Sequence, residues 1–146
     1  MTIRCMKPED YEQVYALWLA CPGLALNDVD DSPEGIARFL AHNPETCCVA
    51  EEDGQIVGVI LTGFDGRRGY IYHTAVHPDR QGCGIGAQLV RASMDALKAM
   101  GVTKGALIAF ASNEGGNAFW EKQGFALRSD VTYRDLILNT FEKIIT

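Results

Sequence analysis

A glycine-spaced turn joins a β-branched run to an amphipathic stretch, and this junction constrains the fold more than any other feature. Tyr70–Val76 is rich in aromatic and β-branched residues, which predicts a strand. Across Ile85–Met100 the apolar residues recur at helical spacing, which predicts a helix. Gly82, Gly84 and Gly86 occupy the junction. A strand–turn–helix unit of this kind is typical of domains in which helices cover a sheet.

The remaining segments predict an alternation of further strands and helices. Pro8 and Pro33 each suit the first position of a helix, and Asp31 or Ser32 suits the cap of the second one. Asp53-Gly54 between two β-branched runs indicates a hairpin. The other expected elements are strands at Thr2–Met6, Thr46–Glu51 and Gln55–Thr62, a buried strand at Ala106–Ala111, a short helix after Asn113 and a final hairpin at Phe125–Leu138. The order β-α-α-β-β-β-α-β-α-β-β predicts a single α/β (α+β) domain over residues 1–146, with a mixed sheet.

Composition excludes several classes of protein. A chain of 146 residues that is 47% hydrophobic can bury a core without disulfides or a metal ion. A net charge of −6 argues against a general nucleic-acid binder. No window approaches the apolar length of a membrane span, and five cysteines without a C-x-x-C pair argue against a zinc ribbon. We therefore expect a cytoplasmic protein with no metal and no membrane or nucleic-acid partner.

The glycine junction favours phosphate binding. Glycines let backbone N–H groups approach a ligand, and the unpaired amides at a helix N-terminus attract anions. The alternative is a tight turn whose glycines relieve strain or help the helix pack. A Walker loop is excluded because no Lys-Ser/Thr follows Gly84 or Gly86. The run from Gly82 to Ala87 fits the degenerate dinucleotide pattern, but Ala106–Ala111 lacks the acidic residue which that pattern requires.

Two motifs together resemble those of the GNAT N-acetyltransferase superfamily. Gln81-Gly-Cys-Gly-Ile-Gly86 resembles its Q/R-x-x-G-x-G/A signature, and Ala75-Val76-His-Pro-Asp resembles the end of its fourth strand. The run from Asn113 to Phe125 resembles its N-x-x-A-x-x-x-Y-x-x-x-G-F motif. The predicted element order is also that of the family, so the resemblance covers essentially the whole chain. It implies a largely antiparallel central sheet flanked by helices.

The resemblance also implies a cofactor and a reaction. Acetyl-CoA would be the co-substrate, and its pantetheine arm would bond to the backbone near Ala75 and Val76 as an added strand. The N–H of Val76 would point at the thioester carbonyl, where losing one donor costs about 3–4 kcal/mol of transition-state stabilisation. An unidentified primary amine would attack directly in a ternary complex. The pyrophosphate would lie on the amides of Gln81, Gly82, Cys83, Gly84, Ile85, Gly86 and Ala87.

Three positions depart from the better-known members. Trp120 replaces the tyrosine that often serves as general acid. Ile108 aligns with the substrate-side glutamate of ribosomal-protein alanine acetyltransferases, and Tyr70 aligns with the basic glutamate of histone-acetylating relatives. These departures leave catalysis open because a thiolate is a tolerable leaving group and water can relay protons. We interpret Trp120 as a wall of the CoA channel, with core packing as the alternative.

Several side chains are candidates near the acyl end. Tyr70, Tyr72 and Tyr133 are titratable, although each is also suited to packing on a sheet. His73 and His77 are possible bases near neutral pH. Strict strand alternation places His73 on the opposite face of the sheet from Tyr70 and Tyr72.

Other side chains and loops have two interpretations. Asn113 either bonds the pantetheine or caps its helix. Cys83 stands at a helix N-terminus but has no evident base beside it, which argues against a covalent mechanism. The segment from Gly23 to Asp31 is a candidate for shaping the acceptor pocket, since loops commonly carry specificity.

Three functional hypotheses follow from these patterns. The first is an acetyl-CoA-dependent N-acetyltransferase. The second is an acyl-CoA-binding sensor or non-catalytic partner of the same fold, motivated by Trp120 and Ile108. The third is a small nucleotide-binding oxidoreductase module resting on Gly82, Gly84 and Ala87. The sequence leaves open the acceptor, the general acid and base, and the choice between monomer and homodimer.

Overall fold

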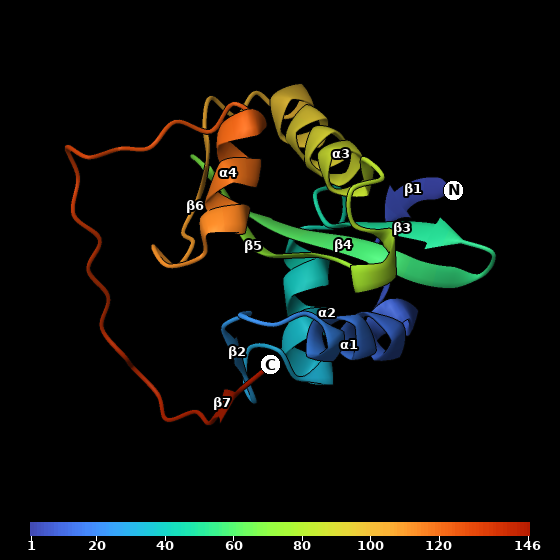
Figure 1. The fold of residues 1–146 in the computed structure, drawn as a ribbon. Helices are drawn as coiled ribbons and strands as arrows, with labels where there is room; N and C mark the ends of the chain where they lie inside the picture. Colours follow the sequence, from blue (N-terminus) through green and yellow to red (C-terminus); the bar gives the residue numbers. More distant parts are fainter.

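A computed structural model describes all residues 1–146 and shows a five-stranded sheet with helices on both faces (Figure 1). The strand order is β1-β3-β4-β5-β6; every neighbouring pair is antiparallel except β5 and β6, which are parallel. The strands are β1 (Thr2–Cys5), β3 (Cys48–Glu52), β4 (Gln55–Phe64), β5 (Gly69–Val76) and β6 (Gly105–Leu107). A separate two-stranded sheet pairs β2 (Leu26–Asn27) with β7 (Lys143–Ile144). The predicted mixed, largely antiparallel sheet is confirmed.

The helices form two layers around the sheet. In Figure 1, α1 (Tyr11–Ala20) and α2 (Pro33–His42) lie on one face, and α3 (Ile85–Ala99) and α4 (Glu114–Lys122) lie on the other. Two 3-10 helices, η1 (Pro8–Asp10) and η2 (Pro78–Arg80), precede α1 and the glycine junction. No helix combines the length and the apolar character that crossing a membrane requires.

Local signals explain where these helices begin. The Ser32 side chain accepts the Gly35 N–H at 3.0 Å, and Pro33 takes the first position of α2. This bond satisfies one of the donors that every helix leaves unpaired at its start. Both features match the cap and the starting proline expected from the sequence.

The core is divided between the two faces of the sheet. One cluster packs α1 and α2 against the sheet, and its members include Val14, Trp18, Ile36, Leu40, Val49 and Val59. The other packs α3 against the opposite face, and its members include Ile60, Ile71, Ile85, Leu89 and Val90. The sheet is thus buried on both sides, which holds β5 in place for the site described below.

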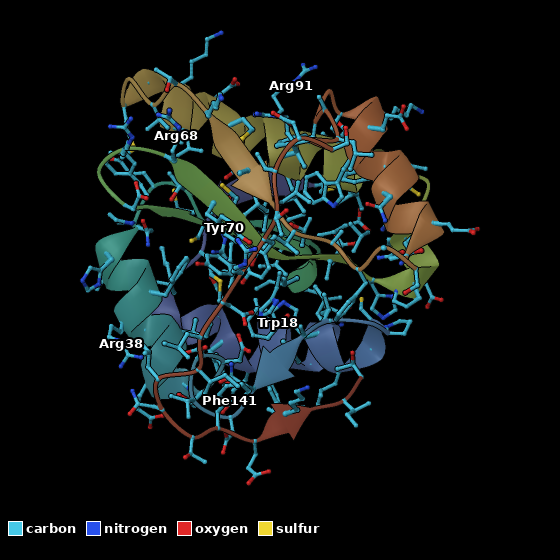
Figure 2. All side chains as sticks on the ribbon, turned by 90° about the vertical axis from the view of Figure 1, so that its left-hand side faces the viewer. Trp18, Arg38, Arg68, Tyr70, Arg91 and Phe141 are labelled. Atoms are coloured by element: carbon cyan, nitrogen blue, oxygen red, sulfur yellow. The ribbon has the colours of Figure 1, made fainter.

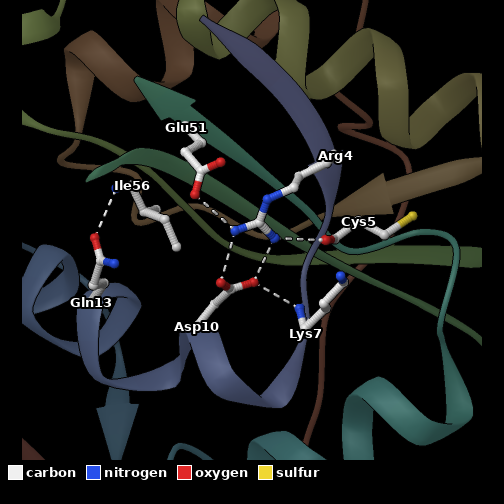
Figure 3. A network of polar contacts seen from close by, with 7 residues as sticks. All are labelled: Arg4, Cys5, Lys7, Asp10, Gln13, Glu51 and Ile56. Atoms are coloured by element: carbon white, nitrogen blue, oxygen red, sulfur yellow. Dashed lines mark hydrogen bonds and ion pairs between the residues drawn. The ribbon is translucent and has the colours of Figure 1, made fainter. Parts of the chain in front are cut away.

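A charged network fastens the N-terminal layer to the sheet (Figure 3). The Arg4 guanidinium donates to both carboxylate oxygens of Asp10 at 2.8 and 2.9 Å and to Glu51 at 3.2 Å. Asp10 also accepts the Lys7 N–H at 2.8 Å. The hydrogen bonds from Arg4 hold the pKa of Asp10 below its ordinary value. This network ties η1 to β1 and β3, and so positions α1.

A β-bulge interrupts β5. Ile60 of β4 pairs with Thr74, whereas Thr62 pairs with Ile71, so Tyr72 and His73 together stand opposite a single residue of β4. Both side chains then face the layer of α1 and α2: the Tyr72 ring packs edge-on against Phe39, and the His73 ring against Trp18. The expectation that His73 lies on the opposite face from Tyr70 and Tyr72 is therefore wrong. The extra residue shifts the alternation by one position.

The expected strand at Ala106–Ala111 is shorter and more exposed than the sequence indicates. β6 ends at Leu107, and Ile108 and Phe110 are 50% and 58% exposed. As an edge strand β6 has only β5 as a partner, and their pairing covers three residues. Burial on both faces, which the apolar run predicted, requires neighbours that this edge does not have.

The predicted hairpin at Phe125–Leu138 does not form. The chain from 126 to 142 has no helix or strand, and Figure 1 shows it in orange and red as a wide arc that leaves the sheet and helices and returns at β7. Apolar side chains in it, such as Leu127 and Leu138, are 94% and 82% exposed. Alternating apolar residues indicate a capacity for strand formation, but a hairpin without a packed partner is marginal. Here the chain end pairs with β2 instead.

Candidate active site

The outer edge of β5 is open along its second half. β6 pairs with β5 only from Gly69 to Ile71, so no strand follows beside the rest. The N–H of His77 bonds to the Val57 carbonyl of β4 at 2.8 Å. Because backbone groups of successive residues point to opposite edges, those of Thr74 and Val76 face the open side. The backbone of Ala75, which pairs with Val59, faces β4.

The glycine junction continues directly from this edge. Gly82 and Gly84 have φ of 78° and 82°, and a Cβ built on either would meet no atom within 4 Å. Gly84 is the N-cap residue of α3 and no side chain caps this end of the helix. The N–H groups of the first turn, from Ile85 to Ala87, therefore lack helical partners and face an open surface. Such an N-terminus suits an anion, because the helix dipole and the free donors act together.

Gly86 has a different role in the same motif. A Cβ on this residue would lie 3.0 and 3.1 Å from two ring carbons of Phe119. That distance is shorter than ordinary van der Waals contact, so the glycine allows α4 to pack closely against α3. These features match the interpretation of a tight turn: Gly82 and Gly84 supply left-handed backbone, and Gly86 supplies room for packing. Phosphate binding at the junction stays a prediction.

Neighbouring side chains hold the junction in place. The Gln81 amide donates to the Val76 carbonyl at 3.2 Å, which links the loop to the end of β5. Arg80 forms an ion pair with Glu52 of β3. His77 accepts the Asp79 N–H at 3.1 Å and so caps η2. Cys83 is exposed, and its thiol lies 3.9 Å from the Gln81 carbonyl.

The residues of the second motif lie in α4. Asn113 accepts the Gly116 N–H at 2.9 Å, so its side chain caps the helix. The Trp120 ring packs edge-on against Phe119 and Phe125, with ring centroids 5.0 and 5.2 Å apart. The structure thus shows capping for Asn113 and packing for Trp120. Phe119 in turn covers Gly86, which brings the two motifs into contact.

A cavity of about 1020 Å³ opens on the α1 and α2 face of the sheet. Its walls come from α2, the loop before α2, β4 and β5. The loop that was expected to shape the acceptor pocket contributes Asn27, Asp30 and Asp31. Figure 2 shows Tyr70 between Arg68 and Arg38, two arginines that also line this cavity.

Two of the three candidate tyrosines line this cavity, whereas Tyr133 is 64% exposed and lies outside the lining. The rings of Tyr70 and Tyr72 lie 4.8 Å apart, and both line it. Burial raises the pKa of Tyr70 to about 12, with smaller contributions from the phenols of Tyr133 and Tyr72. Burial, followed by the charge of Asp30, also raises the pKa of Tyr72. At neutral pH these two phenols are protonated, so they can donate hydrogen bonds but cannot act as bases.

A buried carboxylate–imidazole pair lies in the same cavity, and sequence reasoning missed it. His73 Nε2 is 2.7 Å from Asp31 Oδ1, and the two side chains are only 14% and 5% exposed. The other carboxylate oxygen of Asp31 accepts the Asn27 N–H at 2.8 Å. The sequence offered Asp31 as a helix cap and as the end of the loop expected to shape the acceptor pocket. No local signal reveals this partner, because the contact spans 42 positions and requires the bulge.

Two buried polar side-chain atoms have no hydrogen-bond partner. Trp18 Nε1 and Thr74 Oγ1 are the only buried side-chain nitrogen or oxygen atoms in the chain that make no hydrogen bond. The Trp18 ring lies 5.1 Å from that of His73, and Thr74 follows it in β5. Buried polar groups are nearly always bonded, so exceptions need a reason such as a ligand or a functional site. Trp18 lies on the same face of the sheet as His73, whereas the Thr74 side chain faces the α3 layer, as does that of its partner Ile60.

Comparisons with known proteins agree with this geometry. The sequence profile of the Acetyltransferase (GNAT) family matches residues 11–125. An acetyltransferase of Sodalis glossinidius is 35% identical over 131 residues, which cover 90% of this chain and 91% of that protein. An acetyltransferase of Photorhabdus laumondii is 39% identical over 114 residues, or 78% of each chain.

Solved structures share the fold at low sequence identity. The Ard1 protein of Thermoplasma volcanium superposes with a TM-score of 0.78 at 22% identity and covers 88% of this chain and 84% of its own. The PaiA N-acetyltransferase of Thermoplasma acidophilum, solved in complex with coenzyme A, has a TM-score of 0.77 at 17% identity, with 90% and 94% covered. The profile match and the curated relatives confirm the resemblance that the two motifs indicated, and the chain belongs to the GNAT acetyltransferase family.

Proposed function

We propose that residues 1–146 form a single domain that moves an acetyl group from acetyl-CoA to a primary amine by direct attack in a ternary complex. One observation carries this proposal. The uncapped N-terminus of α3, opened by the left-handed Gly82 and Gly84, continues from the unpaired edge of β5. A free strand edge that leads directly to an anion site fits a ligand with an amide-bearing arm at one end and a pyrophosphate at the other.

In this proposal the pyrophosphate lies on the amides from Gln81 to Ala87. The pantetheine arm then extends along β5 as an added strand, bonding to the outward groups of Thr74 and Val76. We include Thr74 because the strand register directs its backbone groups, and not those of Ala75, to the open edge. Asn113 and Trp120 would border the arm from α4, in addition to their capping and packing roles.

The chemistry needs few side chains. The amine nitrogen forms a bond to the thioester carbon while the carbonyl oxygen takes on negative charge. An outward N–H of Val76 or Thr74 would donate to that oxygen, a contribution worth about 3–4 kcal/mol. The carbon–sulfur bond then breaks, and the excess proton on nitrogen passes to the leaving thiolate. Tyr70 and Tyr133 are proposed as hydrogen-bond donors at this site, since a protonated phenol cannot accept the proton.

The acceptor would enter through the cavity on the α1 and α2 face. Its lining carries aromatic rings and charges of both signs, which fits an amine with further polar groups. Relatives support transfer to an amine in general: one neighbour of the same fold is an aminoglycoside 6'-N-acetyltransferase of Acinetobacter haemolyticus, and PaiA was solved with coenzyme A. The identity of the acceptor stays open.

Two measurements test the proposal. Isothermal titration with coenzyme A and acetyl-CoA should show binding of both ligands, and NAD(P) should not bind. A thiol-release assay over a panel of amino acids, polyamines, aminoglycosides and peptides should show turnover of at least one amine. Absence of coenzyme A binding would refute the whole proposal. Tight binding without turnover of any amine would favour the sensor or non-catalytic partner, the alternative raised by Trp120.

A further inference from the structure

Asp31 and His73 form a buried pair at the point where the cavity meets the open edge of β5. The bulge turns the imidazole toward the cavity, and Trp18 packs edge-on against it. Of the chain's two histidine–carboxylate contacts, the one between His77 and Asp79 is exposed and 3.9 Å long, whereas this one is buried and 2.7 Å long. A short, buried contact of this kind fixes both the position and the orientation of the ring.

The hydrogen bonds of Asp31 determine which ring nitrogen carries the proton. An ionised carboxylate only accepts hydrogen bonds, and one of its oxygens is already occupied by the Asn27 N–H. The other oxygen faces His73 Nε2, so Nε2 must be the donor. In the neutral imidazole this leaves Nδ1 as an acceptor with a free lone pair. No protein group donates to Nδ1, and the side chain lines the cavity.

The position along β5 suits a proton acceptor for the acyl transfer. Thr74, the next residue, presents its N–H to the open edge where the thioester would lie. Trp18 Nε1, a buried donor without a partner, belongs to the ring that packs against His73. An ordered water would satisfy this donor, and one water can carry a proton between an ammonium and the imidazole.

We propose that His73, held by Asp31, accepts the proton of the acceptor ammonium, directly or through one water. This inference rests on the proposed acetyltransferase function. An ammonium has no lone pair, so the nitrogen–hydrogen bond must break before attack. The proton goes to Nδ1, the freed electron pair forms the bond to the thioester carbon, and the imidazolium later releases the proton to solvent. The negative charge of Asp31 stabilises that imidazolium, which makes Asp31 a positioning residue.

Other charged groups face the same cavity and enter the pH dependence. The loop before α2 contributes Asp30, α2 contributes Arg38 and His42, and β5 contributes the protonated Tyr70 and Tyr72. The turn between β4 and β5 contributes Asp65 and Arg68. Outside the lining, Tyr11 of α1 donates to the Asp31 carbonyl, and the C-terminal segment brings Tyr133 near Tyr70. None of these groups lies within hydrogen-bond distance of His73.

The kinetic test uses His73→Gln and the best acceptor of the amine panel. A glutamine amide can still donate to Asp31 but cannot take up a proton, so the pair is kept while the base is lost. We expect kcat to fall about 100-fold or more, with the KM for acetyl-CoA within about twofold and the acidic limb of the pH–rate profile lost. Asp31→Asn should lower kcat at least about tenfold. His77→Asn tests the other histidine that the sequence offered as a base: asparagine keeps a good cap for η2, and the acidic limb of the pH–rate profile should persist.

A second measurement needs no acceptor. Nitrogen-15 NMR of the imidazoles, with coenzyme A present, should show His73 as the Nε2–H tautomer. An Nδ1–H tautomer, or a His73→Gln enzyme that keeps its activity and its acidic limb, would overturn the inference. Either result leaves coenzyme A binding untouched, so this failure is distinguishable from failure of the proposed function.

Discussion

Gly84→Ala tests whether the conformation of the glycine junction is what binds the cofactor. Gly84 has φ 82° and ψ 6°, and a Cβ at this position would meet no atom within 4 Å. The substitution therefore makes no collision within the protein. Its cost is the strain of a left-handed residue with a side chain, about 1–2 kcal/mol.

That strain must lower either the free energy of unfolding or the free energy of coenzyme A binding, and both can be measured. If the variant loop keeps its left-handed backbone, the free energy of unfolding of the unbound protein falls. If the loop relaxes, the strain returns on binding and the affinity for coenzyme A falls instead. The two losses should therefore sum to about 1–2 kcal/mol, where about 1.4 kcal/mol corresponds to tenfold in Kd. Any contact between the new methyl group and the pyrophosphate adds to the loss of affinity.

Urea unfolding and isothermal titration with coenzyme A measure the two terms. The matched control is Gly101→Ala at the other end of α3, where φ is 81° and a Cβ would again meet no atom within 4 Å. It carries the same strain, so its unfolding free energy should fall by about 1–2 kcal/mol while its Kd stays unchanged. A combined loss of zero for Gly84→Ala, or an equal loss of affinity in the control, would refute the reasoning.

Three further predictions follow from the fold. Gly86→Ala should lower the unfolding free energy by about 1–3 kcal/mol, and Phe119→Leu should restore part of that loss in the double variant, measured by urea unfolding. Because Arg4 lowers the pKa of Asp10, the network stabilises the fold above about pH 4, and this stabilisation is lost as the pH falls. Asp10→Asn should therefore lower the free energy of unfolding by about 1.5–3 kcal/mol at pH 7 and by less at pH 3. The pKa of Tyr70 is about 12 in the folded protein and about 10 in the unfolded chain, so its contribution to stability is complete below about pH 10 and is lost as the pH rises to about 12. In Tyr70→Phe the free energy of unfolding, measured by urea, should therefore fall less between these two pH values.

Elements encoded by neighbouring residues could be predicted from the sequence. Ser32 and Pro33 begin α2 as expected, and the apolar stripe from Ile85 onward forms α3. The left-handed backbone at Gly82 and Gly84 likewise follows from residue type. Each of these features depends on interactions within one turn, where the identity of a few residues decides the conformation.

Features that depend on distant partners could not be predicted. The segment from Phe125 to Leu138 has the alternation of a hairpin, but whether it pairs depends on the edge that β6 offers. The contact between Asp31 and His73 requires the loop before α2 to close over β5. Neither residue type nor spacing encodes such an encounter, which is why the sequence placed Asp31 in a cap and His73 on the wrong face.

The bulge in β5 links the two halves of the candidate site. It lies at Tyr72 and His73, immediately after the last β5 residue that pairs with β6. One additional residue therefore does two things at the same point of the strand: it turns the imidazole toward the cavity, and it coincides with the place where the edge of β5 becomes free. Counted from Tyr70 and Ile71, a regular strand would direct His73 into the α3 layer, away from Asp31. The backbone donors for the thioester and the side chain that accepts the proton are thus adjacent because of a single irregularity.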